Sequence, residues 1–241
     1  MRTAAFALLL LVATSAVARP FSFASKTKYA DVEFSYSTEA AAVPALVRKF
    51  RADLAKERSS TLSCGKQEST IRIQTGGQAI ACSSMTKYTT SGQTARLLSL
   101  AKSYYAFTGG AHGNGGTTPL LWDRRLGKEI KFASLFRTPI AYGPPVRAAY
   151  CRALGAERRK RRGPDYQPNS MVPEFDACPK FSDLSLIPSG SPHFRQLHII
   201  AAPYTAGPYS EGEYDIVLPV TPDLLAALKP EYRASFAAQR Q

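Results

Sequence analysis

Apolar and polar residues alternate over several short segments of the chain, which is the pattern of half-buried β-strands. In residues 31–36, Val32, Phe34 and Tyr36 fall on one face. The strands expected from such runs cover residues 31–36, 70–74, 78–83, 96–107, 117–122, 129–132, 194–202 and 212–220. Two pairs of these runs, 70–74 with 78–83 and 117–122 with 129–132, are separated by Gly-containing turns and predict hairpins.

A helical period appears in fewer places. Val43, Leu46, Val47, Phe50 and Leu54 form one apolar stripe and predict a helix. Shorter helices are expected at residues 133–136 and 144–154. Thr221 precedes Pro222 as an N-cap before a C-terminal helix that restarts at Pro230. The pattern predicts an α+β fold, with a mainly antiparallel sheet, packed helices and two small subdomains.

The N-terminus has the features of a secretory signal peptide. Arg2 precedes an apolar run of about ten residues, and Ala16-Val17-Ala18 provides an Ala-x-Ala cleavage site. A membrane span needs roughly 20 apolar residues, so we expect residues 1–18 to be cleaved near Ala18 rather than to anchor the chain. The mature protein is then periplasmic or secreted, without a transmembrane anchor, and begins with a flexible segment over residues 19–30.

Four cysteines remain in the mature chain: Cys64, Cys82, Cys151 and Cys178. An even count in an exported protein favours two disulfides, for which three pairings are possible. We expect the local pairing, Cys64–Cys82 and Cys151–Cys178, whose loops contribute about 3 kcal/mol each in the chain-entropy model. The spacing lacks Cys-x-x-Cys, so no metal site is expected, and nothing in the sequence calls for a cofactor.

The chain is strongly basic, with a formal net charge of +13. Such a charge favours anionic partners. Its densest cluster contains Arg158, Arg159, Lys160, Arg161 and Arg162. We expect this cluster in a basic, Pro-rich insertion at about residues 155–192. Export argues against nucleic acid, which leaves a solvated loop or a contact with an anionic envelope polymer.

Two blocks of sequence resemble a known bacterial family. One runs from Phe107-Thr108-Gly109-Gly110-Ala111-His112-Gly113 to Leu135-Phe136, and the other from Pro203-Tyr204 through Pro208-Tyr209 to Leu218-Pro219-Val220. Both resemble the domain of unknown function at the C-terminus of the anti-sigma factor RsiV, which also accompanies the deacetylase PdaC as a non-catalytic module. Residues 31–100 resemble the small PdaC-like domain that precedes it, and residues 101–238 would form the RsiV-like domain.

The resemblance implies an envelope protein that binds a ligand or partner and does not catalyse a reaction. In RsiV the module is a receptor for lysozyme. C-type lysozyme is basic, so a lysozyme-binding inhibitor would need a local acidic face on this basic chain. We therefore expect a monomeric binding module for a cell-wall glycan, an anionic envelope polymer or a wall-acting protein.

His112 is the strongest catalytic candidate, because a Gly-rich turn could present its imidazole to a ligand. A wall hydrolase or deacetylase would need an acidic partner for it. The alternative is a turn in which the glycines supply positive φ and His112 bonds the backbone. Glu211 and Glu213 could form a carboxylate pair, or simply a solvated entry to the following strand.

Tyr204 and Tyr209 lie in a segment rich in Pro and Gly and are the better candidates for binding. Exposed tyrosine rings stack on sugars or on docked protein surfaces. The alternative is a buried corner beneath the C-terminal helix. We therefore expect the binding residues to be these two tyrosines together with the cluster from Arg158 to Arg162.

Overall fold

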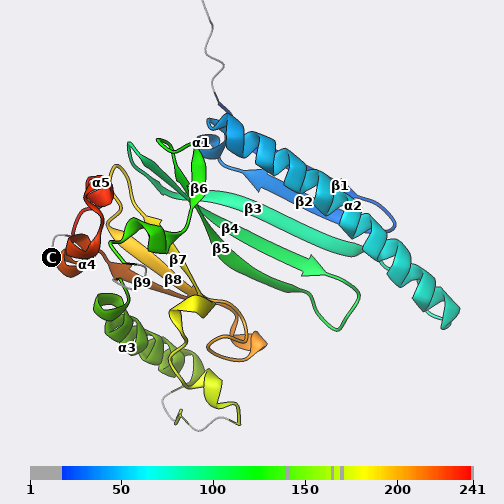
Figure 1. Cartoon of the computed structure of the whole chain (residues 1–241). Helices are drawn as coiled ribbons and strands as arrows, with labels where there is room; N and C mark the ends of the chain where they lie inside the picture. Colours follow the sequence, from blue (N-terminus) through cyan, green and yellow to red (C-terminus); the bar gives the residue numbers. More distant parts are fainter. Residues whose placement is uncertain (1–17, 139–141, 164–165, 169–170, 240–241) are drawn as a thin grey trace, which may run out of the picture.

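A computed structural model describes residues 18–138, 142–163, 166–168 and 171–239. Within these ranges the chain forms two sheets with flanking helices, which confirms the α+β class (Figure 1). The strands are β1 (Phe21–Lys26), β2 (Ala30–Tyr36), β3 (Cys82–Gln93), β4 (Leu97–Phe107), β5 (Asn114–Asp123), β6 (Lys128–Ile130), β7 (Leu184–Ser189), β8 (Gln196–Ala201) and β9 (Tyr214–Pro219). The helices are α1 (Thr38–Ala41), α2 (Pro44–Gln74), α3 (Gly143–Arg162), α4 (Pro222–Ala227) and α5 (Pro230–Arg233).

The larger sheet has the strand order β1-β2-β3-β4-β5-β6. All its neighbouring pairs are antiparallel except β2 and β3, which the α1–α2 crossover makes parallel. The expectation of a flexible start over residues 19–30 is wrong for the part that forms β1. Phe21 and Phe23 pair with Tyr36 and Phe34 and pack against the core, which gives this edge strand apolar contacts.

Helix α2 covers one face of this sheet over β2 and β3 (Figure 1). It continues through Gln74, so the hairpin expected at residues 70–83 is wrong: residues 70–74 are its last turns. The second half of the helix is held by polar and covalent contacts rather than by an apolar stripe. Ser69 bonds both backbone groups of Ile80, and Cys64 is bonded to Cys82. A period-based prediction cannot detect such contacts.

The smaller sheet, β7-β8-β9, packs against α3 and the C-terminal helices. The strands expected at residues 194–202 and 212–220 are confirmed as β8 and β9. The Thr221 hydroxyl accepts a hydrogen bond from the amide of Leu224, as expected of an N-cap. Both expected disulfides are present, and Cys151–Cys178 ties α3 to the segment before β7.

Two buried clusters correspond to the two sheets. One contains Phe34, Phe50 and Trp122 between the larger sheet and α2. The other contains Tyr150, Ile199 and Tyr214 between the smaller sheet and α3. Strand β4 contributes to both, because Leu98 and Leu100 face the first cluster and Leu97 faces the second. The boundary expected at residue 100 therefore falls within one continuous strand.

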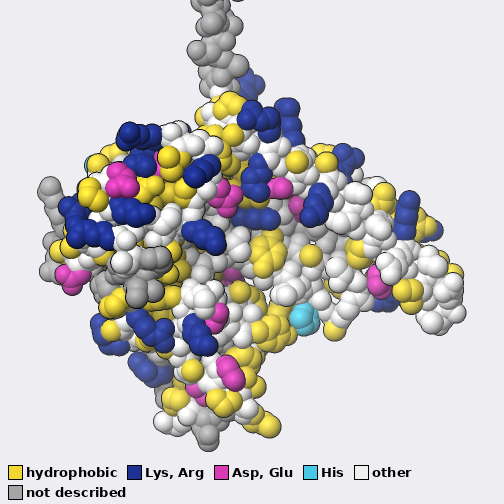
Figure 2. Space-filling view, viewed as in Figure 1, with side chains coloured by type: hydrophobic (Ala, Val, Ile, Leu, Met, Phe, Trp, Pro, Cys, Tyr) yellow, Lys and Arg dark blue, Asp and Glu magenta, His cyan; other side chains and the backbone are white. Residues whose placement is uncertain are grey.

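Lys and Arg side chains are spread over the face seen in Figure 2, with fewer Asp and Glu among them. Residues 1–17, which contain most of the expected signal peptide, lie outside the described part of the chain. None of the described helices is long and apolar enough to cross a membrane.

Candidate functional site

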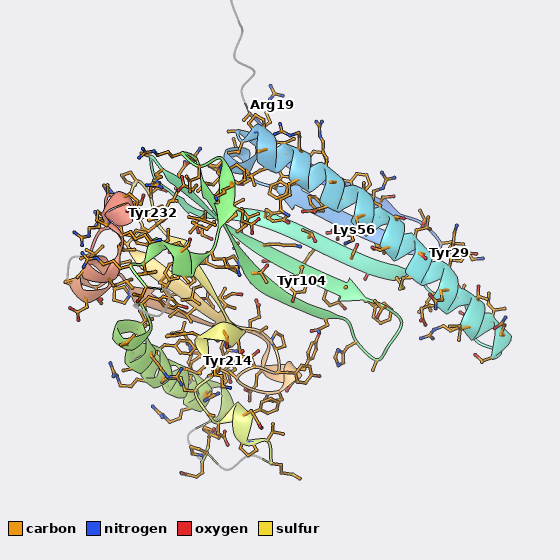
Figure 3. All side chains as sticks on the ribbon, in the orientation of Figure 1. Arg19, Tyr29, Lys56, Tyr104, Tyr214 and Tyr232 are labelled. Atoms are coloured by element: carbon orange, nitrogen blue, oxygen red, sulfur yellow. A yellow bond between two sulfur atoms is a disulfide. The ribbon has the colours of Figure 1, made fainter. Side chains whose placement is uncertain are left out.

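A cleft of about 520 Å³ lies where the free ends of β4 and β5 meet the loop before β9. We call it the tyrosine cleft. It is lined by Ser103, Tyr104, Tyr105, Gly115, Gly116, Thr117, Pro203, Tyr209, Ser210, Glu211, Gly212 and Glu213. Figure 3 labels Tyr104 on β4 and Tyr214 at the start of β9, which mark the two sides of this junction. The cleft thus brings together residues about 100 positions apart in the sequence.

The glycines of residues 109–116 have a different role from the one expected. Within that run, Gly109 alone has positive φ, at 97°. Gly115 and Gly116 instead lie across the strand pair from Tyr105 and Tyr104. A Cβ atom at Gly113 would overlap the Tyr105 ring. The glycines therefore leave room for tyrosine rings to lie over β5, and the expectation that they serve mainly to supply positive φ is wrong.

Tyr104 and Tyr105 are adjacent and equally exposed, at 38% and 37%, but they lie on opposite faces of the sheet. The amine of Lys102 lies 6.0 Å from the ring centre of Tyr104, on the face that carries α2. Tyr105 shares the other face with Ser103 and Thr117. That face contributes the aromatic floor of the cleft.

Three aromatic rings lie close together beside this floor. The rings of His112 and Tyr209 are stacked, with centroids 4.1 Å apart and an angle of 23° between their planes. The ring of Tyr204, on the same loop as Tyr209, is tilted relative to it, with centroids 5.7 Å apart. The Tyr209 hydroxyl donates to the carbonyl of Gly113 at 2.8 Å, which joins the loop to the end of β5. Tyr204 is 52% exposed and has a backbone φ of 70°. Positive φ is a strained backbone conformation for a residue other than glycine, and an exposed aromatic residue in that conformation is typical of a functional position.

His112 makes contacts that do not favour catalysis. Its Nδ1 atom lies 2.8 Å from the carbonyl oxygen of the adjacent Gly113, and its ring stacks on Tyr209. Within the described residues, no carboxylate forms a hydrogen bond with it. The hydrolase and deacetylase hypotheses required such a partner, so the structure gives them no support at this position.

Glu213 is engaged with the opposite strand. Its two carboxylate oxygens accept the Thr117 amide at 2.5 Å and the Thr117 hydroxyl at 2.9 Å. The expectation of a solvated strand entry is therefore wrong for this residue. Strand β6 pairs only with Leu121–Asp123 of β5, so it leaves the rest of that edge of β5 uncovered. The bond between Thr117 and Glu213 occupies part of this uncovered edge.

Along the rest of that edge, the outward amides of β5 are unavailable to another strand. Alternation places Gly115 and Pro119 on the same side as Thr117. Gly115 donates to the Asn114 side chain, and Pro119 has no N–H. An incoming peptide would thus find no free donor there, which argues against strand addition beside the cleft.

The basic cluster lies on α3 and not in a loop, contrary to expectation. Arg158 is 4% exposed and donates three hydrogen bonds, to the backbone carbonyls of Ala206, Asp176 and Ala177. Burial and the nearby Arg162 charge lower the pKa of Arg158, so the site is costly for a cation, and the three carbonyls offset that cost. Through these bonds the guanidinium connects the loop before β9, which carries Ala206, to the segment that carries Asp176 and Ala177.

Two further arginines hold the same loop. Arg161 donates to the carbonyls of Glu211 and Glu213, and its guanidinium lies 4.0 Å from the ring centre of Tyr214. Arg162 bonds both oxygens of the Glu211 carboxylate, at 2.8 and 3.0 Å. Burial would raise the pKa of Glu211, but hydrogen bonds from Arg162 and Tyr214 lower it below its usual value. These arginines position the cleft, while Arg159 and Lys160 are exposed.

Tyr214 completes this support beneath the loop. Its hydroxyl donates to the Glu211 carboxylate, and burial together with that carboxylate raises the pKa of Tyr214 to about 12. Both carboxylates of the cleft are therefore bound by protein donors. Within the described residues there is also no group of three or more His, Cys, Asp or Glu side chains that could hold a metal ion.

Several cleft residues were missed by sequence reasoning. Tyr105 and Thr117 were assigned only to strands, and the role of Glu213 as a link between the sheets was not foreseen. A tyrosine pair followed by glycines at cross-strand spacing was the available signal, since Gly opposite an aromatic ring permits close packing. Of the expected binding residues, Tyr209 lines the cleft and Tyr204 lies next to it.

These features define a two-sheet α+β protein with a cleft at the junction of the sheets, lined by tyrosine rings and glycines. Residues 23–115 match the family model described as Deacetylase PdaC. Two crystal structures align with most of this chain. One is a DUF3298 family protein from Pseudomonas aeruginosa PAO1, with TM-score 0.54, 18% identity, and coverage of 91% of this chain and 97% of that chain. The other is a member of that family from Bacteroides fragilis NCTC 9343, with TM-score 0.45, 15% identity, and coverage of 83% and 89%.

The chain is therefore similar to the PdaC family over residues 23–115, which is less than half of its length, and it shares the fold of a DUF3298 family protein. The expected resemblance to PdaC is confirmed, and the match extends beyond residues 31–100 at both ends. The comparison with curated proteins gives no match.

Proposed function

We propose that this protein is an exported, non-catalytic module that binds a glycan of the cell envelope in the tyrosine cleft. The observation that carries the proposal is that Tyr105 and Tyr209 both line the cleft, with Tyr204 beside Tyr209. Tyrosine rings stack against the C–H faces of sugars, and the hydroxyls of Ser103 and Thr117 lie beside them on the same face. The volume of about 520 Å³ is within the range of small-ligand sites.

Export is part of this proposal. The signal-like N-terminus supports it, and two disulfides are typical of an oxidising compartment outside the cytoplasm. A non-catalytic role is supported by the cleft carboxylates, because Glu211 and Glu213 are held by Arg162, Tyr214 and Thr117. A glycosidase would need one carboxyl free to protonate the substrate.

Lysozyme binding is less well supported. Several acidic side chains are paired with cations, as in Arg96–Asp123 and Arg162–Glu211. The face seen in Figure 2 carries no continuous acidic patch. A basic partner would therefore approach a basic surface.

The test compares three forms of the mature chain in calorimetric titration with soluble cell-wall glycan fragments. We expect Tyr105→Ala to weaken binding by roughly five-fold or more, the equivalent of about 1 kcal/mol for one lost ring contact. Ile73→Ala is the control, since it removes an exposed apolar side chain of α2 that does not line the cleft. Equal losses in both variants, or no binding by the parent protein, would refute the proposal.

A further inference from the structure

The end of the molecule opposite the tyrosine cleft is strongly basic. Four segments meet there: residues 93–96, 123–137, 190–195 and 228–236. They contain nine Lys and Arg against three Asp and Glu. The cations of this basic end are Arg96, Arg124, Arg125, Lys128, Lys131, Arg137, Arg195, Lys229 and Arg233. Since β4 runs from Leu97 near this end to Tyr105 in the cleft, the two regions are about 27 Å apart.

Hydrogen bonds show that these segments form one surface. Arg96 donates to the carbonyl of Glu231 at 2.8 Å, and Arg124 donates to the Gln93 side chain at 2.9 Å. The Lys229 amine donates to the carbonyl of Ser134 at 2.8 Å. In Figure 2, Lys and Arg side chains gather over the part of the molecule that Figure 1 labels α5 and β6.

An exposed leucine stands at the tip of this surface. Leu126 lies in the turn between β5 and β6, within Arg124-Arg125-Leu126-Gly127-Lys128, and is 49% exposed. The turn is held firmly from below. The fully buried carboxylate of Asp123 accepts the amides of Arg125 and Leu126 at 2.9 and 3.1 Å and pairs with Arg96. The amides of Arg125 and Leu126 thus have hydrogen-bond acceptors. The fold of the turn does not require the Leu126 side chain to be apolar.

We propose that the basic end is a docking surface for a membrane rich in anionic phospholipids, with Leu126 entering the headgroup region. A membrane surface offers two features together: negative charge for the lysines and arginines, and an apolar layer 5–10 Å below it for the leucine. A dissolved polyanion would use the cations and leave Leu126 in water. The combination of Leu126 with Arg125 and Lys128 therefore favours a lipid surface.

The experiment measures co-sedimentation of the mature chain with vesicles of mixed phosphatidylglycerol and phosphatidylcholine at 0.15 M salt. We expect binding to these vesicles and none to phosphatidylcholine alone. Arg125→Glu with Lys128→Glu should weaken binding by roughly 30-fold or more, because each cation near an anionic surface contributes about five-fold. Both side chains are exposed, so the variant is expected to fold normally.

The matched control is Arg159→Glu with Lys160→Glu, which changes net charge equally on exposed positions of α3. Screening acts over about 8 Å at this salt, so we expect less than a three-fold effect. Leu126→Ser should weaken vesicle binding by about five-fold while leaving retention on a polyphosphate resin unchanged.

Three outcomes would overturn the proposal: no binding of the parent chain to anionic vesicles, an equal loss in the α3 control, or unchanged vesicle binding in Leu126→Ser. Tyr105→Ala should bind vesicles normally, which separates this proposal from the one for the tyrosine cleft.

Discussion

The carboxylate of Glu213, just before β9, bonds both the amide and the hydroxyl of Thr117 in the middle of β5. This contact connects the smaller sheet to the larger one at the mouth of the tyrosine cleft. It also occupies the outward amide of Thr117, on a part of the β5 edge that does not pair with β6. The same residue thus shapes a binding site and protects an edge from pairing.

Replacing Glu213 should open this junction. We expect Glu213→Ala to destabilise the protein by about 1–3 kcal/mol, because the Thr117 amide loses a charged acceptor. Thermal unfolding measures the stability, and hydrogen exchange of the Thr117 amide measures the local opening. Glu213→Gln keeps one acceptor oxygen, so its stability should lie between that of the parent protein and that of Glu213→Ala. Unchanged exchange at Thr117 in Glu213→Ala would contradict the role assigned to this contact.

Arg158 should be far more important for stability than its neighbour in the sequence. Arg158→Met removes three hydrogen bonds to backbone carbonyls, for which we expect a loss of about 3 kcal/mol in the free energy of unfolding. Arg159→Met, at an exposed position on the same helix, should change it by less than about 0.5 kcal/mol. Urea unfolding distinguishes them. Similar values for the two variants would show that Arg158 does not hold the loop.

Two glycines in helices should respond to alanine in opposite directions. A Cβ at Gly65 of α2 would overlap the carbonyl of Tyr29, so Gly65→Ala should cost about 3 kcal/mol or more as the helix is pushed from the sheet. At Gly155 of α3 the nearest atom is a guanidinium nitrogen of Arg159, 3.8 Å away. Gly155→Ala should stabilise by up to about 1 kcal/mol. Melting temperatures report both, and a stable Gly65→Ala would refute the close approach.

His198 should titrate above its usual range. Its Nδ1 lies 2.8 Å from an oxygen of Asp215, and this hydrogen bond raises the pKa of His198 from 6.5. Because the folded pKa is raised, the pair stabilises the protein fully below about pH 6.5 and loses this effect as pH rises through the folded pKa. Both side chains are partly exposed, so the stabilisation is small.

An NMR titration of the His198 ring measures this shift. Asp215→Asn is the control, and it should return the pKa toward 6.5 because the carboxylate charge is lost. A parent pKa at or below 6.5 would show that the pair does not form in solution.

Local pattern was sufficient for most strands and for the C-terminal cap. The alternation in residues 31–36, 194–202 and 212–220 reflects one buried face, which is a property of neighbouring residues and can be read without the fold. The local disulfide pairing was one of three that the sequence allowed, and it is the one present in the structure. The long second half of α2 did not follow from local pattern, because its support comes from Cys82 and Ile80, which lie after the helix in the chain.

The sequence by itself therefore determined the α+β class, the principal strands and the basic charge of this protein. Only the tertiary structure decided which charges and rings are free to act. Arg158 and Arg162 lie within four residues of Arg159 and Lys160. The first two turn inward to bond a loop about 45 residues away, while the other two face water. Tyr105, Tyr209 and Glu213 likewise form one cleft because two sheets meet. Such contacts join distant segments, and local periodicity carries no information about them.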